Sequence, residues 1–105
     1  MALKIATWNV NSINARLETA LSVLKTIDVD VICLQELKCE DGKFPRGPIE
    51  DLGFNVETHG QKAYNGVAIL SKHRFEEVSR GLPFLEEAND TDEQSRYIEA
   101  VIEAP

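Results

Sequence analysis

The spacing of hydrophobic residues changes twice in the N-terminal third of the chain and predicts a strand, a helix and a second strand. Residues 3–9 carry apolar side chains on both faces of a short extended segment. Apolar residues recur at steps of three and four within residues 14–27, which is typical of one face of a helix. Residues 29–37 form a near-continuous apolar run, as in strands buried on both faces. The helical stripe consists of Leu17, Ala20, Leu21, Leu24 and Ile27.

The rest of the chain alternates turns with short strands. Residues 40–47 form a polar loop, after which Pro48 can open a short helix at its first position and Gly53 can close it. Asn65-Gly66 is a strong turn signal and favours a hairpin between the strands around it. The expected strands are residues 54–59, 67–71, 75–80 and 97–104.

Two polar residues end the first two predicted strands. Strands joined by a helix of this length run parallel, so Asn9 and Glu36 are expected at the same edge of the sheet, where ligands bind in α/β proteins. Carboxylate and amide oxygens are ligands that Mg²⁺ prefers. The sequence therefore predicts a partial site for a divalent ion. The alternative is that Glu36 is only a charge that reaches water at a strand end.

The expected sheet has more apolar surface than the chain can cover. The helical stripe covers one face, and the helix near Pro48 is too short to cover the other. Either the sheet packs against another sheet layer, or the chain is a portion of a longer protein. Because the chain stops on Glu103-Ala104-Pro105, at the end of the last predicted strand, we expect it to be a portion of a longer protein.

Composition places the chain among ordinary globular proteins and outside the membrane. Its 105 residues are 43% hydrophobic and 28% charged. No apolar run is long enough to span a bilayer and the start is unlike a signal peptide, so we expect a cytoplasmic protein with no membrane partner. Cys33 and Cys39 lack metal-binding spacing and are expected as free thiols, the first in the core and the second in an exposed loop.

The net charge of -7 is unevenly distributed. Most of it lies in residues 81–105, where Arg96 is the single basic residue among several acidic ones. Residues 81–95 are therefore expected to form a solvated acidic loop. A negative net charge gives no sign of a basic surface that binds nucleic acid, but a local groove can still be basic.

Four segments resemble, in order and spacing, the motifs of the exonuclease III family. Thr7–Ile13 resembles the opening motif, and Asp30–Lys38 resembles the second. Gly60–Ser71 resembles the third, and Gln94–Ile98 resembles a weaker fourth. Members are Mg²⁺-dependent nucleases and abasic-site endonucleases of the endonuclease/exonuclease/phosphatase superfamily.

The resemblance implies an α/β fold, a four-layer α/β sandwich in which two sheets pack face to face. This chain would supply half of it, with one mixed sheet and helices on one face of that sheet. Members are usually more than twice this long, so residues 1–105 would be the N-terminal portion of a single, incomplete domain. The later tyrosine, the Asp-x-Asn segment and the closing Asp-His pair of the family are missing, so no catalytic set is complete.

The resemblance also implies roles for individual residues. Glu36 would bind Mg²⁺ directly, with Mn²⁺ as an alternative ion, and Asn9 would belong to the same metal cluster. Asn14 departs from the pattern, because many members carry Arg there, and one contact to the DNA backbone is not expected. The substrate-binding residues would be Asn11, Lys38, Tyr64, Asn65 and Arg96.

Several of these residues also have a purely structural interpretation. Lys38 could be a solvated lysine after a strand, and Asn11 could only cap a helix. Tyr64 could pack its ring on the hairpin, and Arg96 could pair with the acidic loop before it.

The function implied is that of a Mg²⁺-dependent DNA repair nuclease that hydrolyses phosphodiester bonds. The complete enzyme would be a 3′-5′ exonuclease and abasic-site endonuclease acting on double-stranded DNA with abasic sites or 3′ ends. With one carboxylate at the site, the isolated chain is expected to be inactive. Two alternatives stay open: a phosphatase or phosphodiesterase acting on lipid or inositol phosphates, and a non-catalytic module that self-associates through its uncovered sheet face or binds a complementary half.

Overall fold

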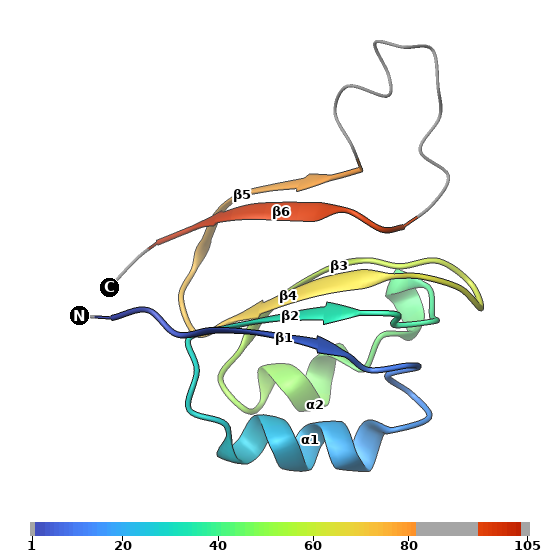
Figure 1. Ribbon diagram of the computed structural model, residues 1–105, viewed down its shortest axis with the longest axis horizontal. Coiled ribbons are helices and arrows are strands. Elements are labelled where there is room, and N and C mark those ends of the chain that lie inside the picture. The colour runs from blue at the N-terminus through green and yellow to red at the C-terminus, as the bar shows by residue number, and fades with distance from the viewer. Residues whose placement is uncertain (1, 82–94, 104–105) are drawn as a thin grey trace, which may run out of the picture.

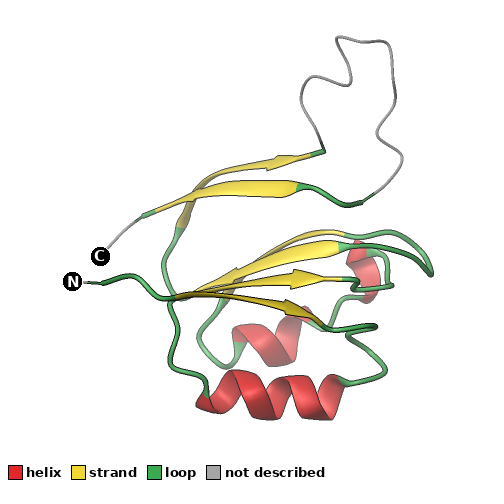
Figure 2. Ribbon diagram, in the orientation of Figure 1, coloured by secondary structure: helices red, strands yellow, loops and turns green. Residues whose placement is uncertain are grey.

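The computed structural model describes residues 2–81 and 95–103, which form three layers (Figure 1). Two helices lie on one face of a four-stranded sheet, and a two-stranded sheet lies on the opposite face (Figure 2). The predicted acidic loop falls almost entirely outside the described residues. The elements are β1 (Ile5–Asn9), α1 (Leu17–Thr26), β2 (Val31–Gln35), the 3₁₀ turn η1 (Asp41–Lys43), α2 (Arg46–Glu50), β3 (Asn55–His59), β4 (Val67–Ser71), β5 (Phe75–Arg80) and β6 (Ile98–Ile102).

The four-stranded sheet has the mixed topology that the sequence predicts. Its strand order is β1-β2-β4-β3, with β1 and β2 parallel and the other neighbours antiparallel. Asn9 pairs with Gln35 in the register of the parallel strands, so both strands end at the same edge. The predicted hairpin is confirmed, because His59 pairs with Val67 across the turn. The expectation of a mixed sheet with helices on one face is therefore correct.

The core lies between the four-stranded sheet and the helices. Ile32 and Leu34 of β2 and Leu70 of β4 point their side chains to this side and are almost fully buried. Ala20 and Leu24 from the predicted helical stripe pack against them. The period of the stripe identified the buried face of α1 because residues three or four apart share one side of a helix.

The opposite face of the sheet is only partly covered. β5 and β6 pair antiparallel and pack over β3 and β4, which leaves the β1 side without a second layer. Ile5 of β1 remains 63% exposed. The predicted shortage of cover is therefore seen at β1, where one face of the strand meets the helices and the other meets solvent.

Helix α1 starts three residues later than the sequence predicts. Asn11 and Ser12 adopt positive φ angles, of 45° and 79°, so the chain turns just before the predicted helix, and residues 13–16 continue as turns. Ser12 Oγ accepts a hydrogen bond from the Ala15 N–H at 3.3 Å and closes a turn instead of capping the helix. Local side-chain bonding of this kind competes with helix formation, so the first helical residue is Leu17.

Helix α2 and the cysteines also differ from expectation. Pro48 is the third residue of α2 rather than its first, which the helix tolerates because its first N–H groups have no intrahelical partner.

Both thiols are free, but Cys39 is buried and Cys33 only half-buried, the reverse of the prediction. Burial raises the pKa of both thiols, which keeps them protonated near neutral pH. No helix in the described part of the chain is long and apolar enough to cross a membrane.

Asp30 fastens the end of the sheet away from Asn9 and Glu36. Its Oδ2 accepts the backbone N–H of Lys4 at 2.8 Å, and its Oδ1 lies 2.9 Å from Nε2 of His73. The bond from Lys4 is the main cause, followed by that from His73, of the lowered pKa of Asp30. A carboxyl whose pKa is depressed by folding stabilises the fold above its unfolded pKa and loses that contribution as the pH falls through its folded pKa.

We expect Asp30→Asn to lower the free energy of unfolding at pH 7, with the difference from the wild type shrinking as the pH falls below about 4. Urea unfolding at pH 7 and at pH 3 measures both quantities. Asp28→Asn is the matched control, because Asp28 is 93% exposed and meets Lys4 only at 3.5 Å. An equal loss in the two variants, or a difference that is unchanged at pH 3, would contradict this role of Asp30.

Candidate functional site

Three loops meet at the edge of the sheet where β1 and β2 end. The loop after β1 is joined to the segment after β2 by the Ser12 N–H, which donates to the carbonyl of Glu36 at 2.9 Å. That segment is joined to residues 60–66, the loop between β3 and β4, by the Lys38 N–H, which donates to the carbonyl of Asn65 at 2.8 Å. The backbone therefore fixes these loops relative to one another before any side chain contributes.

Strained backbone is concentrated in the same three loops. In the described part of the chain, every non-glycine residue with a positive φ angle lies in one of them. Such conformations cost about 1–3 kcal/mol each and cluster at functional sites, because the surrounding structure must hold them in place. The strain marks this edge of the sheet as the candidate site. The residues are Asn11, Ser12, Glu36, Lys38, Ala63 and Asn65.

Asn9 and Glu36 come together as the parallel strands predict. Asn9 Nδ2 donates a hydrogen bond to the Glu36 carboxylate, and Asn9 Oδ1 accepts the N–H of Asn11 at 3.1 Å. The second bond orients the Asn9 amide so that its nitrogen faces the carboxylate. Among the described residues, no Lys or Arg forms an ion pair with Glu36, so its charge remains available to a cation.

Two basic side chains converge on Asn11 beside this pair. Lys38 Nζ donates to Asn11 Oδ1 at 2.6 Å, and Arg16 Nε donates to the Asn11 carbonyl at 3.4 Å. Asn11 is therefore not a helix cap, and Lys38 is more than a solvated lysine. Sequence reasoning missed Arg16, whose one signal is a positive charge directly before the helical stripe. Neither cation forms an ion pair with a carboxylate in the described part of the chain.

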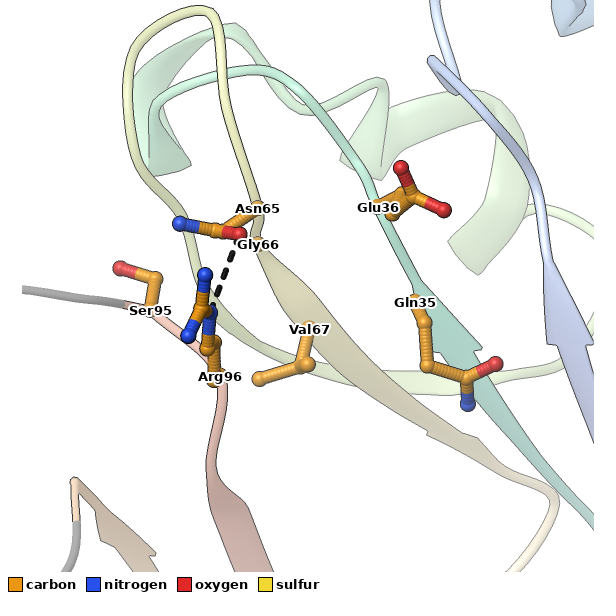
Figure 3. Close-up of a pocket in the computed structure, with 7 residues that line it drawn as sticks. All are labelled: Gln35, Glu36, Asn65, Gly66, Val67, Ser95 and Arg96. Carbon is orange, nitrogen blue, oxygen red and sulfur yellow. Dashed lines mark hydrogen bonds between the residues drawn. The ribbon is translucent and has the colours of Figure 1, made fainter.

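A pocket of about 240 Å³ opens next to Glu36 (Figure 3). Glu36 and Gln35 lie on one side of it, and Asn65 and Arg96 lie on the other. Arg96 Nε donates to Asn65 Oδ1 at 3.3 Å, so two predicted substrate-binding residues form a pair. The full lining is Gln35, Glu36, Asn65, Gly66, Val67, Ser95 and Arg96.

The remaining predictions at this edge concern Tyr64 and Arg96. Tyr64 is 70% exposed, so the interpretation that its ring packs on the hairpin is wrong. The acidic residues with which Arg96 was alternatively expected to pair lie outside the described residues. Sequence reasoning also missed Gln61 and Ser95, which contact the loop residues around Asn65.

The donor set at this edge suits a hard divalent ion held weakly. Mg²⁺ takes one or two carboxylates together with water and substrate phosphates, and Glu36 offers one carboxylate. The residues that the structure describes contain no group of three His, Cys, Asp or Glu side chains that could hold a metal ion by themselves. A closed structural site, such as that of Zn²⁺, needs about four such ligands and does not fit here.

Comparison with known proteins assigns the chain to a family. The sequence model described as the endonuclease/exonuclease/phosphatase family matches residues 6–103, which contain both sheets except Ile5, and all three loops of the site. The chain belongs to this family. The resemblance to the exonuclease III family is confirmed by a relative of that name, which matches 96% of this chain.

The similar proteins include a nuclease, a 3′ phosphatase and an endonuclease. Exodeoxyribonuclease III of Haemophilus influenzae is 37% identical over 101 residues, which cover 96% of this chain and 36% of the relative. A 3′ phosphatase from Neisseria bound to a product DNA hairpin is 42% identical, with a TM-score of 0.87 over 96% of this chain and 38% of its own. An AP endonuclease from Archaeoglobus fulgidus is 42% identical, with a TM-score of 0.83 over 96% of this chain and 37% of its own. The chain thus spans well under half the length of these relatives.

Proposed function

We propose that residues 1–105 are the N-terminal portion of an exonuclease III-type DNA repair nuclease. The complete enzyme would hydrolyse phosphodiester bonds at abasic sites and at 3′ ends of double-stranded DNA. The observation that carries the proposal is the Glu36 carboxylate, which is held by Asn9 and forms no ion pair with a described residue. Two basic side chains, Lys38 and Arg96, lie on either side of it. The names of the relatives favour DNA over lipid or inositol phosphates.

The proposed roles follow from the contacts of each residue. Glu36 would hold Mg²⁺, or Mn²⁺ in its place, and Asn9 would keep the carboxylate oriented. When bound, the ion would act as a Lewis acid that stabilises negative charge on a phosphate. The other predicted residues would bind the DNA backbone, because positively charged and amide side chains donate hydrogen bonds to phosphate oxygens. They are Asn11, Lys38, Tyr64, Asn65 and Arg96.

The uncovered face of β1 supports the proposal that the domain is incomplete. Ile5 on β1 and Leu3 just before the strand are both exposed. Burying apolar surface is favourable by about 25 cal/mol per Å², so a further layer over these residues would be stabilising. The greater length of the relatives supplies a source for that layer.

The isolated chain is expected not to cleave DNA, and a chimera tests the proposed function. The chimera replaces the matching 36% of the Haemophilus influenzae relative with this chain, and its substrate is a duplex with one abasic site in Mg²⁺. We expect cleavage by the chimera and none by its Glu36→Gln variant. A folded but inactive chimera would contradict the function. Cleavage by the isolated chain that disappears in Glu36→Ala would show that this chain completes a site by itself.

A further inference from the structure

Gln61 connects two segments that are far apart in the sequence. Its Oε1 accepts hydrogen bonds from Asn65 Nδ2 at 3.2 Å and from the Ser95 N–H at 2.9 Å. Its own backbone N–H donates to the Cys39 carbonyl at 3.1 Å, which anchors it to the segment after β2. One side-chain oxygen thus joins the loop before β4 to the segment that enters β6.

The bond from Asn65 to Gln61 decides which way the Asn65 amide faces. Because the Asn65 nitrogen points to Gln61, its oxygen points to Arg96 and accepts the Nε–H at 3.3 Å (Figure 3). In the opposite orientation, the amide would turn an N–H toward a guanidinium group that can only donate. The acceptor on Gln61 and the Nε–H of Arg96 therefore favour the same orientation of the Asn65 amide.

The bond from Ser95 to Gln61 fixes the backbone beside Arg96. Ser95 is buried, its Oγ donates to the Gly60 carbonyl at 2.9 Å, and its own carbonyl accepts the Gly66 N–H at 2.8 Å. The next residue, Arg96, is thereby held against the pocket opposite Glu36. Arg96 uses Nε for Asn65 and forms no ion pair with a described carboxylate, so its terminal nitrogens can bind an anion.

We propose that Gln61 is a positioning residue that sets Asn65 and Arg96 as a pair for one phosphate group of DNA. Gln61 does not contact the phosphate. It acts through the orientation of the Asn65 amide and the placement of Ser95. The proposal rests on the proposed function, because it assumes that the pocket beside Glu36 receives a phosphate.

A double-mutant cycle on the full chain tests this role. The probe is a short DNA hairpin duplex, and its affinity is measured by NMR titration at low salt. Gln61→Met keeps the length of the side chain but removes the acceptor. We expect it to weaken DNA binding about 10-fold, because hydrogen bonds to charged groups such as Arg96 contribute about that much. In an Arg96→Ala background, Gln61→Met is expected to have a much smaller effect, because one residue of the pair that it positions is gone.

Two further readouts separate positioning from general stability. In the free protein, Gln61→Met should shift the Asn65 side-chain amide and Arg96 Nε–H resonances, whereas Gln61→Glu, which keeps an acceptor, should preserve them. Gln61→Met that binds DNA like the wild type, or that weakens binding equally with and without Arg96, would overturn the positioning role. A wild-type chain that does not bind the hairpin, together with an unchanged Arg96→Ala variant, would overturn the proposed function and this role with it.

Discussion

Replacing Glu36 by Gln is expected to weaken the binding of Mg²⁺ to the isolated chain. Gln keeps the shape of the side chain and an oxygen for the Asn9 amide, so the loops should keep their arrangement. It removes the negative charge at the centre of the candidate site. Loss of a directly bound carboxylate should weaken binding by at least about 10-fold, since even the groups that support a metal ligand contribute 10- to 100-fold.

Titration with MgCl₂, followed by the backbone amide resonances of residues 35–38, measures this effect. Glu40→Gln is the matched control, because Glu40 is an exposed carboxylate a few residues farther along the chain. We expect Glu40→Gln to bind Mg²⁺ like the wild type. Equal Mg²⁺ affinity in the wild type and in Glu36→Gln would show that the ion binds elsewhere.

Replacing Gly66 by Ala is expected to destabilise the fold more than any surface change at the site. Gly66 has a φ of 95°, which side chains with a Cβ rarely adopt, and an added Cβ would lie 2.9 Å from the Leu37 Cβ. Backbone strain and overpacking each cost about 1–3 kcal/mol, so a loss of at least about 2 kcal/mol is expected. The damage should also spread to the site, because the Gly66 carbonyl accepts the N–H of Leu37 and its N–H donates to Ser95.

Urea unfolding of Gly66→Ala and Gly42→Ala distinguishes this cause from the general effect of adding a methyl group. Gly42 lies in η1, and beyond its chain neighbours an added Cβ there would meet nothing within 4 Å. Gly42→Ala should therefore be neutral or stabilising by up to about 1 kcal/mol, because alanine loses less conformational entropy on folding than glycine. If both variants lose the same stability, the close approach of Gly66 to Leu37 is not the cause.

The sequence by itself determined the elements and the pair at the centre of the site. Periodicity shows which face of an element is buried, so the stripe of α1 and the buried run of β2 could be identified without a structure. The parallel direction of β1 and β2 follows from the helix between them, and it brings Asn9 to Glu36. Such inferences succeed because they depend on backbone geometry that is common to all proteins of this class.

Only the tertiary structure decided how the loops fit together. Lys38 meets Asn11 and Gln61 meets Ser95 across 27 and 34 residues of sequence, separations that no local pattern encodes. Cys39 is buried for the same reason, because the loop that carries it packs under the sheet edge instead of pointing to water. Hydrophobic periodicity describes regular elements, whereas loops take positive φ angles and single hydrogen bonds that depend on distant residues. The pair Asn9 and Glu36 was therefore predictable from the sequence, and the groups that surround it were not.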